Sequence, residues 1–327
     1  MKEILKDLVS INTINDKDNS KIVNYIESYL KDLGFTTEYK SKCLVMSNRK
    51  DCNIGFLGHT DTVDYSNDWD TNPFELVEKD NKFYGLGTCD MKGGIATILS
   101  VIPKIKFKDK GIKMIFTYDE EIGFSGIKEL LDKKIVFPDT MIIGEPTNNE
   151  IINSSKGLLD LKVIFKGLTA HASTPEEGIN AIDKCITFIN ELNNYYTDLK
   201  KEIINNNSLT MNIGKINGGR YSNIVADTCE VSIDFRTVSK KQNKEIIKKI
   251  KSLIKDDTLE VISNIDPFIS NSEINMSNFL TEASLIDSKN RYILGLNNNA
   301  HKKNEFITKE SIKLLEKQYI EIIKNNI

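Results

Sequence analysis

Acidic and imidazole side chains follow several apolar segments of the sequence, at the points where those segments end. His59 and Asp61 follow "NIGFLG", the run Asp119–Glu121 follows "IKMIFTY", and Glu145 follows "TMIIG". Asp90 lies in "GLGTCD", just ahead of another apolar segment. Carboxylate oxygens and imidazole nitrogens are the ligands that zinc and similar divalent cations take in proteins. The set therefore predicts a catalytic metal site that keeps an open position for water.

Two zinc ions that share one bridging carboxylate need about five protein ligands, since each catalytic zinc keeps a position open for water. The chain has only three histidines. His59, Asp90, Glu121 and Glu145 would supply four ligands, and His301, in "GLNNNAHKKNEF", is the natural fifth.

Two further carboxylates are placed to assist these ligands. The adjacent pair Glu120 and Glu121 offers one ligand and one unligated carboxylate, and a general base must not have both of its oxygens held by metal. Asp61 lies two residues after His59, on the same side of an extended backbone. We expect it to accept the second imidazole N–H and fix the tautomer of His59.

The elements that must position these residues alternate between strand-like and helix-like segments. "NIGFLG", "IKMIFTYD" and "TMIIGE" are short apolar runs, typical of buried parallel strands. "MKGGIATILSVIPKI" and "FSGIKELLDKK" have helical character. The alternation predicts an α/β fold with a mixed, mostly parallel sheet and helices on both faces. Ligands of such sheets bind at the carboxyl ends of the strands, where the polar residues gather.

The pattern changes near Lys156. Strand-like segments "GLLDLKVIFKG", "SLTMNIGKIN", "DTCEVSIDFRTV" and "TLEVISNI" flank two helical segments in the order βαββαβ. The first helix is expected to open at Pro175, with Ser173 and Glu176 at capping-box spacing. We therefore expect a larger domain of residues 1–155 and 266–327 and an inserted, smaller α+β domain of residues 156–265.

Composition excludes several classes of partner. The 327 residues include 44 basic and 47 acidic side chains, interspersed for a net charge of -3, with no basic stripe for nucleic acid or an anionic membrane. Five cysteines without a C-x-x-C pair indicate neither a disulfide framework nor a thiolate zinc site. No signal-peptide pattern and no run of about 18 apolar residues is present, so we expect a cytoplasmic protein.

A series of motifs, in order and over nearly the whole chain, resembles the dizinc aminoacylase/carboxypeptidase family of metallopeptidases. That family includes acetylornithine deacetylase, succinyl-diaminopimelate desuccinylase and several exopeptidases, and its catalytic domain has a zinc-peptidase fold. The motifs are "GHTDTV", "GLGTCDMKGG", "TYDEEIG", "GEPT", "GLTAHASTPEEGINAI", "GGRYSNIVADTCEVSIDFR" and "AHKKNEF".

The resemblance implies how the ligands divide between two Zn²⁺ ions per chain, with Co²⁺ or Mn²⁺ as alternatives. His59, Asp90 and Glu145 would surround one ion. Asp90, Glu121 and His301 would surround the other, so that Asp90 bridges the pair.

The resemblance also implies roles for residues that hold no metal. Glu120 would be the general base that takes a proton from the metal-activated water and then protonates the departing amine. The insert would be a lid and dimerisation domain whose His171 stabilises the oxyanion, in its own or the partner subunit. Asn223 and Arg236 would contact polar groups of the substrate, the guanidinium gripping a carboxylate.

The expected activity is removal of the acyl group from an N-acyl amino acid, with acetylornithine or acetyl-lysine as the leading substrate. A succinyl-diaminopimelate desuccinylase, a di- or tripeptidase, and a non-catalytic binding protein on the same fold are the alternatives. Leu86, Glu282 and the "GLNNN" loop depart from common family patterns and leave substrate choice open.

Some residues of these motifs have simpler interpretations. Close packing accounts for Gly93 and Gly94, and a small buried side chain for Cys89. Asp119 is either a turn acceptor or a supporting carboxylate, and Arg236 is a strand-end surface charge if it does not bind substrate.

Overall fold

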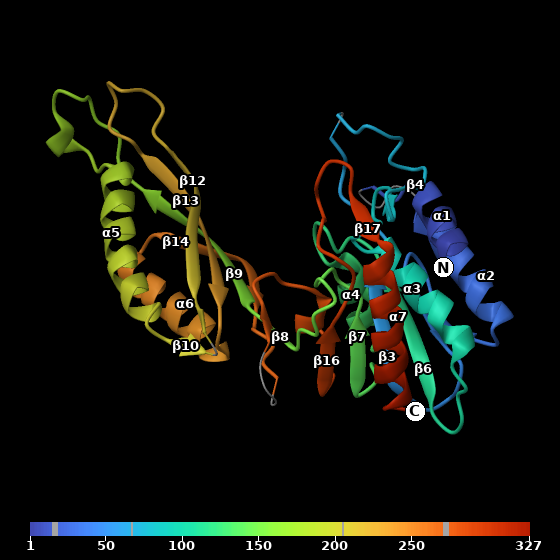
Figure 1. The fold of residues 1–327 in the computed structure, drawn as a ribbon. Helices are drawn as coiled ribbons and strands as arrows, with labels where there is room; N and C mark the ends of the chain where they lie inside the picture. The colour runs from blue at the N-terminus through green and yellow to red at the C-terminus, as the bar shows by residue number, and fades with distance from the viewer. Residues whose placement is uncertain (15–18, 67, 205, 271–274) are drawn as a thin grey trace. The chain divides into compact units, whose positions relative to one another are not determined.

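The computed structural model describes residues 1–14, 19–66, 68–204, 206–270 and 275–327. The chain divides into two compact units (Figure 1). The first unit combines Met1–Asn153 with Thr281–Ile327, and the second unit is Ser154–Leu280.

The first unit is built on a six-stranded sheet in the order β1-β2-β6-β3-β7-β16. Strands β6, β3, β7 and β16 pair in parallel with one another, whereas β2 pairs antiparallel with both β1 and β6. The prediction of a mixed, mostly parallel sheet is therefore confirmed. The strands are β1 (Thr36–Lys40), β2 (Leu44–Ser47), β3 (Cys52–His59), β6 (Gly111–Thr117), β7 (Thr140–Ile143) and β16 (Asn290–Ile293).

Helices cover both faces of this sheet because successive strand residues point to opposite sides. Phe56 and Phe116 belong to one hydrophobic core with side chains from α1, α2, α3 and α7. Their neighbours Leu57 and Ile115 belong to a second core with α4. The helices are α1 (Lys2–Ser10), α2 (Asn19–Asp32), α3 (Lys92–Val101), α4 (Ser125–Asp132) and α7 (Lys309–Lys324).

Helix α3 is buried along its whole length and packs closely against the backbone around it. A Cβ atom on Gly93 would lie 2.0 Å from the carbonyl oxygen of Thr88, and one on Gly94 would lie 2.8 Å from that of Gly144. Both glycines are therefore needed for packing. The close approach holds the start of α3 against the carboxyl end of β7.

A small three-stranded sheet, β17-β5-β4, completes the first unit. Its strands are antiparallel and join two distant parts of the sequence, because β17 follows the second unit in the chain. They are β4 (Val77–Lys79), β5 (Lys82–Tyr84) and β17 (Phe306–Thr308), and a 3-10 turn, η1 (Ile102–Lys104), follows α3.

The second unit contains an antiparallel sheet in the order β12-β13-β9-β14. Along β9 (Gly157–Lys166), Leu159, Leu161 and Val163 are buried in one core with side chains of the two helices, while the residues between them are part-exposed. The remaining elements are α5 (Ala181–Leu199), a hairpin of β10 (Ile203–Ile204) and β11 (Asn207–Ser208), β12 (Thr210–Gly218), β13 (Thr228–Thr237), α6 (Lys240–Ile254) and β14 (Thr258–Ile265).

The second unit extends past the residue where we expected the chain to return to the larger domain. After β14, Phe268 exchanges two backbone hydrogen bonds with Ser155, at 2.8 and 3.1 Å. Strand β15 (Met276–Ser277) then pairs in parallel with β8 (Ser154–Ser155). These contacts keep residues 266–270 and 275–280 with the second unit, and the short turn η3 (Glu282–Ser284) opens the returning segment.

The expected start of the first helix of this unit is wrong. Pro175–Glu177 forms only a short 3-10 turn, η2, and α5 begins at Ala181. Between them, Ile179 pairs with Leu168 in an extended conformation that no helix can contain. The helix cap is Asn180, whose Oδ1 accepts the Ile182 N–H at 2.9 Å.

In the parts of the chain that the structure describes, no helix is both long enough and apolar enough to span a membrane.

Candidate active site

The acidic and imidazole residues singled out in the first unit lie at one edge of its large sheet. His59 is the last residue of β3, and the segments after β6 and β7 carry the Glu120–Glu121 pair and Glu145. Asp90 lies in the loop before α3, and His301 lies in the loop between β16 and β17. Because β3, β6 and β7 are parallel neighbours, their carboxyl ends bring these side chains together.

Asp90 lies between the two histidines. One of its oxygens, Oδ1, is 3.0 Å from His59 Nε2, and the other, Oδ2, is 3.4 Å from His301 Nε2. Glu145 Oε2 is 3.9 Å from His59 Nε2, and Glu121 Oε2 is 3.1 Å from His301 Nε2. The five residues therefore form two adjoining groups that share the carboxylate of Asp90.

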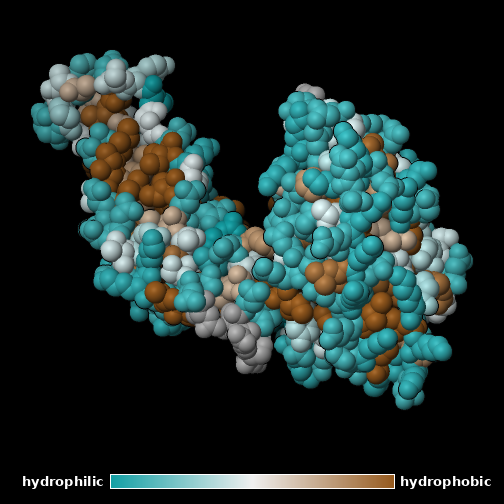
Figure 2. Space-filling view, viewed as in Figure 1, coloured by the Kyte–Doolittle hydropathy of each residue, from teal (hydrophilic) through white to brown (hydrophobic). Residues whose placement is uncertain are grey.

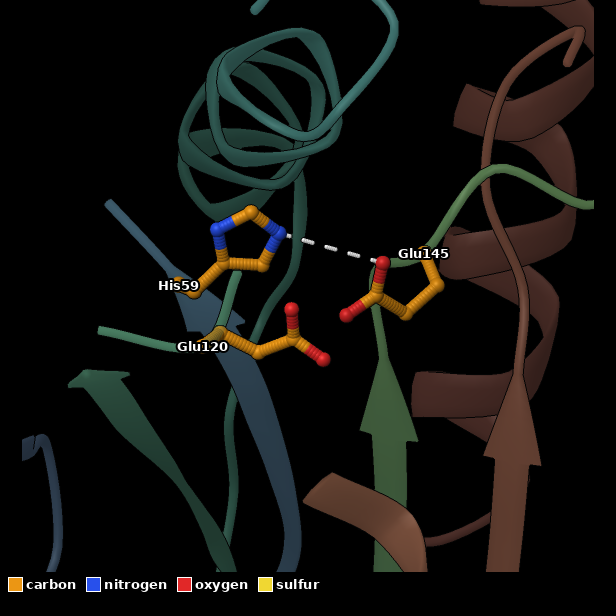
Figure 3. A group of neighbouring side chains, drawn as sticks. All are labelled: His59, Glu120 and Glu145. Atoms are coloured by element: carbon orange, nitrogen blue, oxygen red, sulfur yellow. Dashed lines mark ion pairs between the residues drawn. The ribbon is translucent and has the colours of Figure 1, made fainter. Parts of the chain in front are cut away.

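Glu120 points toward the same centre. Figure 3 shows its carboxylate directed at His59 and Glu145, from the loop beside β3. One potential ligand atom from each of these three residues lies within 4.8 Å of the others, and the same holds for His59, Asp90 and Glu121. The carboxylate of Glu120 therefore lies beside the five residues that could bind metal and is additional to them.

Burial dominates the electrostatics of this cluster. Burial, followed by the charge of Glu145, raises the pKa of Glu120 well above its usual range, and burial likewise raises the pKa of Glu145. Burial by itself lowers the pKa of His59, but the charges of Glu145, Asp61 and Asp90 outweigh it and raise that pKa. The carboxylates of the centre therefore disfavour one another's ionised form, as like charges in a buried site do.

The donor set fits divalent cations. Within the described parts of the chain, Asp61 Oδ1 and Glu145 Oε1 are buried and accept no hydrogen bond. A buried carboxylate oxygen without a partner is costly, and an excess of buried acidic groups is stabilised by a bound cation. The Nε2 atoms of His59 and His301, which face the two oxygens of Asp90, complete a mixed nitrogen and oxygen set of the kind that zinc takes.

His59 is oriented mainly by a main-chain acceptor. Its Nδ1 is 3.0 Å from the carbonyl oxygen of Asp61 and 3.4 Å from Asp61 Oδ1. The other carboxylate oxygen of Asp61 accepts the Glu121 N–H at 3.2 Å. We expected the side chain of Asp61 to accept the imidazole proton, whereas its backbone oxygen is nearer and its carboxylate also anchors the loop after β6.

The other three residues singled out from the sequence lie in the second unit. His171 Nδ1 accepts the Ser173 N–H at 3.2 Å, so a neutral His171 carries its proton on Nε2. The Arg236 guanidinium forms a fork on Asp234, with Nε and Nη2 bonds of 2.9 and 3.1 Å. Asn223 lies in an exposed segment, where its carbonyl oxygen accepts the Ala172 N–H.

Neighbouring motif residues have structural roles. Burial raises the pKa of the Cys89 thiol, which donates to the carbonyl oxygen of Asn297 at 2.9 Å, so no reactive thiolate is formed there. The backbone of Asp119 has a left-handed conformation, with φ of 58°. Its carboxylate accepts a hydrogen bond from the Ser125 hydroxyl at the start of α4. Asp119 is thus a turn acceptor.

Two buried carboxylates near the cluster were missed as site residues. Glu305 is 2% exposed and accepts three backbone N–H groups from the Asp90 loop. Glu282 is fully buried, accepts from Thr117 Oγ1 at 2.9 Å, and has a pKa that burial raises to about 7. The signal for Glu305 was its place in "AHKKNEF", four residues after His301.

Fold and site together define a metallopeptidase-like hydrolase. Residues 55–325 match peptidase family M20/M25/M40, and the chain belongs to that family. Its members hydrolyse amide bonds, so the chain is an amide-bond hydrolase by class.

The known relatives extend this assignment. An acetylornithine deacetylase of Buchnera aphidicola is 35% identical over 256 residues, which cover 72% of this chain and 67% of the relative. Aminopeptidase PepT from Bacillus cereus has a similar fold, with a TM-score of 0.82, 21% identity, and coverage of 99% of this chain and 98% of that one. YXEP from Bacillus subtilis, described as a dinuclear metal-binding peptidase, gives a TM-score of 0.74 at 12% identity, covering 100% and 98%.

Proposed function

We propose that this chain is a metal-dependent deacylase that removes the acyl group from an N-acyl amino acid, with acetylornithine or acetyl-lysine as the leading substrate. The observation that carries the proposal is the position of Asp90 between two imidazoles, with Glu120 beside the same centre. The deacetylase relative at 35% identity supports acyl transfer to water as the reaction.

The two groups around Asp90 would hold two Zn²⁺ ions, or Co²⁺ or Mn²⁺ in their place. His59 and Glu145 would complete one site, and Glu121 and His301 the other, with Asp90 common to both. When bound, such cations polarise the substrate carbonyl and make a water acidic enough to attack at neutral pH.

Glu120 would move the protons of the reaction. As a carboxylate with a raised pKa, it takes one proton from the water whose oxygen attacks the acyl carbon. When the C–N bond breaks, Glu120 returns that proton to the leaving nitrogen, which departs as the amine. The acyl group leaves as a carboxylic acid, so the atoms of one water are accounted for.

The second unit would supply groups for the substrate. We propose that His171 donates a hydrogen bond from its Nε2–H to the oxyanion, a role that its hydrogen bond from Ser173 supports by fixing the tautomer. Contacts from Asn223 and Arg236 to substrate polar groups stay predictions. Since Asp234 occupies Nε and Nη2 of Arg236, a substrate carboxylate would have to use Nη1 or displace Asp234.

The experiment that tests the proposal measures amine release by the zinc-loaded protein. Acetylornithine and acetyl-lysine are compared with succinyl-diaminopimelate and with short peptides, which represent the alternative activities. We expect the highest kcat/KM for an N-acetyl amino acid. Preference for a di- or tripeptide would replace the deacylase by a peptidase, and no release from any compound by a metal-loaded chain would favour a binding protein.

We further propose that the protein is a homodimer formed through its second unit. Figure 2 shows hydrophobic residues gathered on the visible face of that unit. Ile186 on α5 is 52% exposed and Ile216 on β12 is 56% exposed, which is unfavourable for apolar side chains that remain in water. Light scattering is expected to give twice the chain mass of 37.1 kDa, and a mass equal to one chain would exclude the dimer.

The cytoplasmic location of the protein stays a prediction.

A further inference from the structure

Glu305 is hydrogen-bonded to the loop that carries Asp90. Its Oε1 accepts the N–H groups of Cys89 at 2.6 Å and Asp90 at 3.0 Å, and its Oε2 accepts the N–H of Gly87 at 2.9 Å. The side chain is buried, so water does not compete for these donors. A single carboxylate therefore fixes three backbone groups of one short loop.

The small sheet brings Glu305 to this loop. Strand β17 begins immediately after Glu305 and pairs with β5, which ends just before Gly85. The carbonyl oxygen of Glu305 also accepts the Gly85 N–H at 3.1 Å. The backbone of Glu305 thus bonds Gly85, at the start of the loop of residues 85–90, and its side chain bonds Asp90, at the end of that loop.

Glu305 also belongs to the loop that carries His301. Only three residues separate the two, and Asp90 and His301 face each other across 3.4 Å. The Cys89 thiol makes a further link, accepting the Asn299 N–H at 3.2 Å. The two loops are therefore held together at several points, and Glu305 bonds the backbone N–H of Asp90 itself.

We propose that Glu305 is a positioning residue. By holding the Asp90 loop and the His301 loop in a fixed relative position, it sets the spacing between Asp90 and His301. The inference rests on the proposed function, because the spacing matters only if Asp90 and His301 bind metal together. Groups that orient metal ligands by hydrogen bonds contribute to affinity without touching the ion.

Two substitutions of Glu305 remove part or all of its hydrogen bonds to the Asp90 loop. Glu305→Gln keeps the size of the side chain but turns one acceptor oxygen into a donor, whereas Glu305→Ala removes every bond. Glu129→Gln is the matched control, since Glu129 also accepts three hydrogen bonds in the first unit, from Tyr39, Ser41 and Tyr118, away from the Asp90 loop.

The measurement is titration of the metal-free, full-length proteins with Zn²⁺ against a chelator, together with the absorption spectrum of the Co²⁺-loaded proteins. We expect Zn²⁺ affinity to fall by about 10- to 100-fold in Glu305→Gln, and further in Glu305→Ala, as is usual for groups that orient ligands. The Co²⁺ spectrum is expected to change in the Glu305 variants and to stay unchanged in Glu129→Gln.

The outcomes separate this inference from the proposed function. Unchanged Zn²⁺ affinity and an unchanged Co²⁺ spectrum in Glu305→Gln would overturn the positioning role while leaving the deacylase intact. A wild-type chain that binds neither ion would instead end the proposed function. If Glu305→Ala does not fold, the comparison of Glu305→Gln with Glu129→Gln decides alone.

Discussion

Replacement of Glu120 by glutamine is expected to lower kcat for amide hydrolysis by about 10²- to 10⁴-fold, the usual contribution of a general base. Glutamine has nearly the same shape but cannot take a proton from water. The effect should fall on kcat more than on KM, because the lost interaction belongs to the transition state. Steady-state kinetics on the preferred N-acyl amino acid measure it.

Metal content and melting temperature should stay close to wild type in Glu120→Gln. Glu150→Gln serves as the control, since Glu150 is exposed in the segment after β7 and has no place in the proposed mechanism. Retention of more than a tenth of wild-type kcat by Glu120→Gln would refute the assignment of Glu120 as the base.

Asp90→Asn is expected to remove most of the bound metal. Both proposed sites use this carboxylate, one through Oδ1 toward His59 and the other through Oδ2 toward His301. Asparagine keeps the backbone N–H that Glu305 accepts but lacks the charge and one acceptor oxygen. Bound cations stabilise the charge of the transition state by several kcal/mol. The hydrolysis rate of Asp90→Asn is therefore expected to be at least about 10³-fold lower than that of the wild type.

Elemental analysis after dialysis and the hydrolysis assay together check this expectation. Asp119→Asn is the matched control, because Asp119 is a turn acceptor for Ser125 in the loop that carries Glu120 and Glu121. It should keep its metal. A full metal complement in Asp90→Asn would show that Asp90 does not bridge two sites.

Most of the first unit could be predicted because its signals are local. "NIGFLG", "IKMIFTY" and "TMIIG" are apolar runs that form β3, β6 and β7, and parallel strands end at one edge of a sheet. The placement of His59, Glu121 and Glu145 near one another follows from that rule. His301 lies in an irregular loop with φ of 58°, so only the motif around it indicated its place.

The features that could not be predicted depend on contacts between distant segments. The start of α5 is delayed to Ala181 because Ile179 pairs with Leu168, and a capping pattern at Ser173 does not report that pairing. The fork between Arg236 and Asp234 depends on strand geometry. Glu305 contacts the Asp90 loop across more than two hundred positions of sequence, for which a single sequence holds no local signal.

The order of the segments along the chain determines when the proposed metal centre of the first unit can form. His59, Asp90, Glu121 and Glu145 precede the second unit, while His301, β17 and α7 follow it. Tyr319 and Leu315 of α7 are also fully buried in the main core, so this core is complete only when α7 has packed against the earlier segments. The metal centre that we propose can therefore assemble only in a nascent polypeptide that has been synthesised beyond His301.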